Sequence, residues 1–109
     1  MASVQTNEGE SFLARERANL FRGWEGVGGM ITVTDKRIIF QPHMFNIQRD
    51  VVEIPLKDIV DVRERSTYGL INNGMLVKTG SGQEYKFVLN NREKIINLIK
   101  QHMGPLRTA

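Results

Sequence analysis

The sequence predicts a mainly β domain: about seven short antiparallel strands, rolled into a barrel, with one C-terminal helix capping it. One observation is that short apolar runs recur along most of the chain, several alternating with polar residues and separated by glycine, asparagine or proline. Another is that the apolar residues after Asn90 follow a helical period instead. A chain of 109 residues has room for one such domain.

The most informative stretch, GMITVTDKRIIFQP at residues 29–42, predicts a β-hairpin. Its pairing register places four apolar side chains on one face: Ile31, Val33, Ile38 and Phe40. Thr32 and Thr34 fall on the other face. A four-residue turn over 34–37 keeps this register and asks less of the backbone than a tight Asp-Lys turn would.

The remaining strands are predicted at 18–22, 51–54, 59–65, 75–79 and 84–89. Alternation in the third of these turns Val60 and Val62 inward. Residues 10–17 fit a helix and a strand equally, and the glycine-rich stretch 23–29 predicts a mobile loop. Asn72-Asn73-Gly74 predicts a turn.

The C-terminal segment predicts an amphipathic helix. Asn90 is a candidate N-cap, and Glu93 three residues later resembles a capping box. One face carries an apolar stripe: Ile95, Ile96, Ile99 and Met103. Gly104 and Pro105 end the helix. A single helix cannot bury this stripe alone, so we expect it to pack across an open end of the barrel.

Four sequence pieces in this order resemble the GRAM domain in its compact bacterial form: Gly9-Glu10, ANL at 18–20, GGMITVTDKRIIF from Gly28, and IPLKDIVDV from Ile54. The resemblance covers about residues 9–103. It implies a pleckstrin-homology-like barrel over 10–104, between tails at 1–9 and 105–109. It also implies a binding or adaptor module in place of an enzyme.

Chemistry-bearing residues are sparse. The chain has no cysteine, which removes thiolate metal sites and fits a reducing, cytoplasmic location. His43 and His102 have no partners that the sequence can supply, so we expect no catalytic residues, no metal and no cofactor. Asp58 and Asp61 are expected to face solvent. Gly26-Val27-Gly28-Gly29 leads into a strand and no lysine completes a phosphate loop, so a small-molecule substrate is not expected.

Charge and hydropathy restrict the classes of partner and the cellular location that we expect. The net charge of +3 comes from 15 basic and 12 acidic residues that are interspersed, which disfavours nucleic acid. No apolar run is long enough to span a bilayer, and residues 1–10 lack the pattern of a secretory signal. We therefore expect a cytoplasmic protein, with a peripheral position at the membrane left open.

The resemblance implies that three loops meet at one end of the barrel. This end would hold the candidate binding residues: Arg22, Trp24, His43, Met44, Phe45, Arg49, Lys78 and, beside them, Ser81. From the first strand pair, Arg22 is the only basic residue on that side, Thr32 stands where a second cation would help, and Glu25 adds repulsion. Specific recognition of a phosphoinositide is therefore disfavoured.

The apolar residues of that end have two interpretations. Met44, Phe45 and Ile47 either continue a strand into the core or join Trp24 in a contact surface. For the contact surface, the first-choice ligand is another protein or a second copy of the chain. The alternative is an anionic membrane, with Trp24 and Phe45 as wedges and Arg22 and Arg49 as phosphate contacts.

Arg37 begins a strand at the other end of the barrel. A structural role is expected for it, with Asp35 or Asp58 as its partner in a salt bridge.

Overall fold

The computed structural model describes residues 6–43, 51–67 and 71–104. The elements follow in chain order: β1 (Phe12–Arg22), β2 (Glu25–Thr34), β3 (Arg37–Pro42), β4 (Val52–Pro55), a 3-10 turn η1 (Leu56–Asp58), β5 (Ile59–Thr67), β6 (Ile71–Thr79), β7 (Glu84–Leu89) and α1 (Arg92–His102). All strand pairs are antiparallel. The predicted fold of seven antiparallel strands with one C-terminal helix is confirmed.

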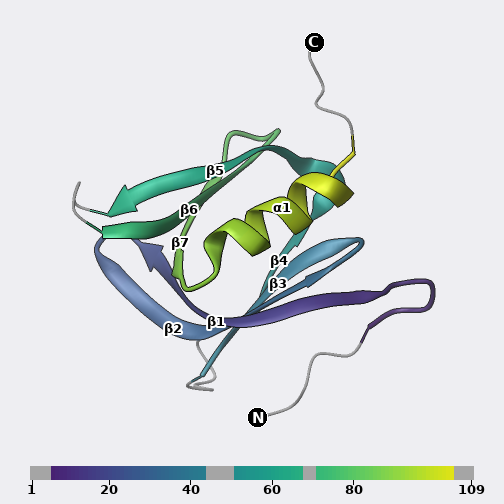
Figure 1. The fold of residues 1–109 in the computed structure, drawn as a ribbon, viewed down its shortest axis with the longest axis horizontal. Coiled ribbons are helices and arrows are strands. Elements are labelled where there is room, and N and C mark those ends of the chain that lie inside the picture. The colour runs from purple at the N-terminus through teal and green to yellow at the C-terminus, as the bar shows by residue number, and fades with distance from the viewer. Residues whose placement is uncertain (1–5, 44–50, 68–70, 105–109) are drawn as a thin grey trace.

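The strands form one strongly curved sheet in the order β4-β3-β2-β1-β7-β6-β5. The two edge strands, β4 and β5, follow one another through η1 but do not pair in the described part of the chain, so the sheet is not a closed barrel. Figure 1 shows α1 lying across the opening between the two halves of the sheet, and α1 contacts β5, β6 and β2.

The core forms between the concave side of this sheet and α1. Ile95, Ile96 and Ile99 of the helix are buried there, and Met103 packs at its edge, as the helical period predicted. Phe40 and Phe87 lie against each other at the centre, with ring centroids 6.0 Å apart. Burial of these side chains is the main source of stability in a domain of this kind.

The register predicted for the central hairpin is confirmed. Val33 pairs with Ile38, and Ile31 pairs with Phe40, all four being fully buried. The turn is held by Thr34, whose hydroxyl oxygen accepts bonds from the amides of Lys36 at 3.1 Å and Arg37 at 3.0 Å. The threonine therefore acts as a local cap for the reversal.

The glycine-rich stretch is not a loop, so that prediction is wrong. The β1–β2 reversal takes only Gly23 and Trp24, with Gly23 at φ 65°, and the strand resumes at Glu25. The glycines allow neighbouring groups to approach the strand backbone closely. A methyl group on Gly29 would overlap the Gln41 carbonyl and lie 2.8 Å from the Phe40 ring. A glycine inside a strand commonly marks such a backbone contact. Strand β1 is correspondingly long and includes most of the ambiguous segment.

Two further predictions in the second half of the sheet are wrong. Val60 points outward and is 42% exposed, because a bulge between Ile59 and Asp61 inserts it as an extra residue; Val62 is buried as predicted. Asn72-Asn73-Gly74 lies within β6 and is not a turn, since Thr67 already pairs with Ile71.

The predicted capping box is also wrong. The N-cap of α1 is Asn91, one residue later than predicted, and it makes no side-chain capping bond. Its backbone is left-handed at φ 57°, a conformation that asparagine tolerates better than most residues. The predicted helix end is confirmed, because Gly104 follows the C-cap at φ 87°.

Candidate functional site

The two-residue turn between β1 and β2 holds Trp24 out into solvent. The indole is 91% exposed, the largest exposure among the large apolar residues that the structure describes. Arg22 and Glu25, which flank the turn, pair with each other in the ladder. The turn is only two residues long, with glycine at its left-handed position, so the backbone that carries Trp24 is flanked directly by the paired strands.

A hollow of about 550 Å³ opens beside this turn. Its walls come from the end of β1, the start of β4 and the start of β7, three segments far apart in the sequence: Leu20, Phe21, Arg22, Gly23, Val52, Gln83, Glu84, Tyr85 and Lys86. It lies where the β1–β4 half of the sheet separates from the β5–β7 half. We call this region, with Trp24, the open end.

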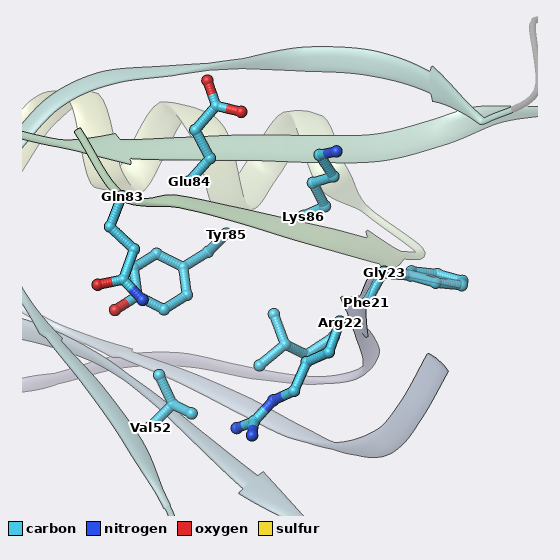
Figure 2. A pocket seen from close by; sticks show the side chains of 9 residues that line it. Phe21, Arg22, Gly23, Val52, Gln83, Glu84, Tyr85 and Lys86 are labelled. Atoms are coloured by element: carbon cyan, nitrogen blue, oxygen red, sulfur yellow. The ribbon is translucent and has the colours of Figure 1, made fainter. Parts of the chain in front are cut away.

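Figure 2 shows which of these side chains enter the hollow. Arg22 extends toward Val52, and the ring of Tyr85 lies next to Gln83 on the facing wall. Glu84 and Lys86 leave β7 on its other side and point away. Among the described lining residues, only Arg22 thus brings a cation into the space, and it has no carboxylate partner in residues 6–43, 51–67 and 71–104.

A second hollow, of about 510 Å³, continues from the first along β4. The two share Gln83 and Tyr85. It is lined by β4, η1, the exposed bulge residue Val60 and the β6–β7 turn, which includes Ser81. The two hollows therefore adjoin each other in a depression between β4 and β7.

The predicted binding residues are only partly brought together. Arg22 lines the hollow and Trp24 projects beside it. His43 is exposed next to β2, where its amide donates to the Gly28 carbonyl at 3.0 Å. Lys78 lies in β6 on the outer face, paired with Glu84 and away from the hollow. Met44, Phe45 and Arg49 lie outside the described residues, and so does Ile47.

Sequence reasoning missed Val52, Gln83 and Tyr85. The signal for Tyr85 was available, because alternation in EYKFVL places it on the same side as the buried Phe87. Tyr85 is the first of the β7 side chains on this side, and it is only partly buried at the edge of the core. Val52 meets this wall only through the curvature of the sheet, which no local pattern encodes.

The opposite end of β2 is closed by an ion pair, and we call it the clasped end. The Glu10 carboxylate, 2% exposed, accepts two bonds from Arg37: Nε at 2.7 Å and Nη2 at 3.0 Å. The Thr34 hydroxyl also donates to Glu10 at 2.7 Å. The partners predicted for Arg37 are wrong, because Asp35 instead accepts from the Ser11 amide at 2.8 Å and the second carboxylate at Arg37 is Glu53, at 3.3 Å.

These bonds shift the titration of Glu10. Hydrogen bonding to Arg37 is the largest cause and lowers the pKa of Glu10 from its ordinary 4.5 to about 2, although burial acts in the opposite direction. The same hydrogen bond raises the pKa of Arg37. The pair therefore stays ionised at every physiological pH, which suits a structural clasp and does not suit proton transfer.

The two histidines lie apart from each other and from these features. His102 bonds through Nδ1 to the Leu98 carbonyl at 2.9 Å, one turn back along α1. Among the described residues, histidine, aspartate and glutamate do not gather in groups of three or more that could hold a metal ion. No helix in the same residues is long and apolar enough to cross a membrane.

A protein-family model for the GRAM domain matches residues 2–104. The chain belongs to the GRAM domain family. This fold, which the GRAM family shares with pleckstrin-homology domains, is generally a binding module. No curated protein matches the chain.

Solved structures agree on the fold of this GRAM domain. The C-terminal domain of an unknown protein from Leishmania infantum superposes with a TM-score of 0.76 at 16% identity, over 88% of this chain and 86% of that one. The Vps36 N-terminal PH domain gives 0.71 at 15% identity, over 91% and 83%. The N-terminal PH domain of human ARAP2 gives 0.65 at 14% identity, over 94% and 85%. At these identities the likeness establishes the fold alone.

Proposed function

We propose that this GRAM domain, of the compact bacterial type, is a non-catalytic binding module that engages a partner protein through its open end. The observation that supports this most directly is the 91% exposure of Trp24 on a two-residue turn, beside a hollow into which Arg22 extends without a carboxylate partner among the described residues. Tryptophan and arginine are the side chains most enriched where protein interfaces concentrate their binding energy.

The charge of the hollow favours a protein over a phosphoinositide. A headgroup with several phosphates requires several cations, and of the described residues that line the hollow only Arg22 extends a cation into it, while Lys86 points away. Aromatic and polar groups, from Tyr85 and Gln83, supply the rest of the lining. Such a mixed lining suits a peptide side chain better than a polyanion.

The proposal is tested by photo-crosslinking from the turn. Trp24 is replaced by a photoreactive phenylalanine analogue in cells that make the full chain, and adducts are identified by mass spectrometry. One recurring protein adduct, absent when the analogue replaces Phe12, is expected. Phe12 is the matched control because it is 57% exposed and lies at the far end of β1. Adducts with lipid alone, or the same adducts from both positions, would contradict the proposal.

A second candidate is attachment to an anionic membrane, and the exposure of Trp24 next to Arg22 favours it, because indole rings sit well at the headgroup level of a bilayer. In this candidate, Trp24 is a wedge that enters the bilayer surface and Arg22 contacts a lipid phosphate. The sequence predicts Phe45 as a second wedge and Arg49 as a second phosphate contact. Flotation with vesicles containing phosphatidylserine at low salt tests it, since charge attraction is strongest there. Vesicles that float free of the protein would exclude this candidate.

A further inference from the structure

The depression between β4 and β7 has the shape of a groove along an unpaired strand. Its two hollows, of about 550 and 510 Å³, meet at Gln83 and Tyr85. One wall is β4, from Val52 at the Arg22 end to Pro55 at the Val60 end. The opposite wall is the β6–β7 turn and the start of β7. We call this the β4 groove.

The wall formed by β4 offers backbone hydrogen-bonding groups. The Leu56 amide donates to the Lys36 carbonyl at 2.9 Å, which shows which positions face β3. Because backbone groups alternate in direction along a strand, the N–H and C=O of Glu53 and the C=O of Pro55 face the groove. In the described part of the chain, β4 pairs with β3 alone, so these groups have no strand partner.

We propose that the β4 groove binds an extended peptide segment of a partner protein, aligned antiparallel to β4. The Glu53 amide and carbonyl would bond to its backbone. One apolar side chain would rest against Val60 and Tyr85, and a carboxylate would meet Arg22. The inference rests on the proposed function and names the form in which the partner enters the site.

The orientation of the segment follows from the direction of β4. Antiparallel pairing is the commoner arrangement, and β4 begins at the Arg22 end of the groove. An antiparallel segment therefore ends near Arg22. The carboxylate there is either an acidic side chain close to the end of the segment or the C-terminus of the partner, and both present the same chemistry to a guanidinium group.

Neither a second copy of the chain nor a lipid fits the β4 groove as well. If two copies of the chain paired their β4 edges antiparallel, centred on Glu53, the two Glu53 residues would lie directly opposite each other. Like charges in that position are destabilising. Pro55 also removes a donor from such a pair. A lipid has no alternating donors and acceptors to match the Glu53 amide and carbonyl.

The test uses a random octapeptide library displayed on phage, in one arm with free C-termini and in the other embedded within the coat protein, with the full chain as bait. Selected peptides containing an apolar residue followed by a carboxylate are expected. Enrichment in the free-terminus arm alone identifies a terminal carboxylate, and enrichment in both arms identifies an acidic side chain.

Affinities of a selected peptide are then measured by fluorescence anisotropy. Val60→Asp and Arg22→Glu should each weaken binding by about tenfold or more, as expected for central contacts. Their matched controls, Phe12→Asp and Arg17→Glu, introduce the same acidic residues at exposed positions outside the groove and should leave the affinity within about twofold. In amide NMR spectra, the Glu53 resonance should shift and its hydrogen exchange should slow on binding.

Several results would overturn the inference. They are the absence of any enriched peptide, binding that Val60→Asp does not weaken, or a chain dimer that this substitution dissociates. The last result would identify a second copy as the occupant. A protein adduct from Trp24 that survives Val60→Asp would remove the inference and leave the proposed function standing, whereas the absence of both adduct and peptide would remove both.

Discussion

The two ends of β2 differ in what their charged side chains do. At the clasped end, Arg37 is bonded to Glu10 and Glu53, and Thr34 is bonded into the same network. At the open end, Arg22 extends into a hollow without a carboxylate partner in the described residues, and Trp24 stands in solvent. The charged side chains of the clasped end bond to one another and stabilise the fold, whereas the Arg22 side chain at the open end is available to a ligand.

The difference has an energetic side. Burying a large apolar side chain stabilises a fold by roughly 1.5–3 kcal/mol, and Trp24 contributes almost nothing of this kind. The buried Glu10 carboxylate, by contrast, would be destabilising without its partner. Substitutions at the clasped end should therefore affect stability, and substitutions at the open end should affect binding.

The largest effect is expected in the core that both ends share. Ile99→Ala should lower the free energy of unfolding by roughly 2–5 kcal/mol, because Ile99 is fully buried. Urea denaturation followed by circular dichroism measures this loss. Hydrogen exchange should speed up at both ends together. Faster exchange at one end alone would mean that the ends are independent units and would break the comparison.

At the clasped end, Arg37→Met should cost about 3 kcal/mol, because it leaves the Glu10 carboxylate buried without its main donor. Arg17→Met is the matched control, since Arg17 is an exposed arginine of β1, and it should change the stability by less than about 0.5 kcal/mol. Equal losses in the two variants would show that the ion pair is not what closes this end.

The same ion pair predicts a dependence on pH. The pKa of Glu10 is lowered to about 2 in the folded protein, so its stabilising contribution is complete above its ordinary pKa of 4.5 and is lost as the pH falls toward 2. Unfolding free energies of the wild type and Glu10→Gln, measured between pH 7 and pH 2, should therefore converge on acidification. A difference that stays constant over this range would exclude the clasp as the source.

The smallest effect on stability is expected at the open end. Trp24→Ala should change the free energy of unfolding by less than about 0.5 kcal/mol, because the side chain is almost fully exposed and belongs to no buried cluster. Chemical denaturation tests this value, and binding of the groove peptide or of vesicles is measured on the same sample. A loss above 1 kcal/mol would assign Trp24 a structural role.

Sequence patterns predicted the fold where one side of a segment is buried. The register of Ile31 and Val33 against β3 was predictable because a slip of one residue would turn all of these side chains away from the face that they share with Ile38 and Phe40. The stripe on α1 was predictable for the same reason. The failure at Val60 follows from the same logic, since a bulge shifts the alternation by one residue without leaving a mark in the sequence.

Glycine was the main source of error. The stretch from Gly26 to Gly29 was predicted as a loop because glycine is frequent in loops, but here it is a strand with close neighbours: a Cβ on Gly26 would lie 3.1 Å from the Phe21 ring, and one on Gly29 would overlap the Gln41 carbonyl. Long-range partners were equally hidden. Glu10 and Arg37 are 27 positions apart, and no local rule connects them. The pocket residue Val52 was missed for the same physical reason.

The solvent-exposed position of Trp24 has a consequence for spectroscopy. It is the only tryptophan in the chain, and its indole is already surrounded by water in the folded protein. Its fluorescence should therefore report unfolding poorly, because emission from both states arises in the same aqueous surroundings. The same exposure makes Trp24 an intrinsic fluorescent probe of binding. A shift of its emission to shorter wavelength, with protection from iodide quenching, can arise only when a bound partner or membrane covers the tip of the hairpin.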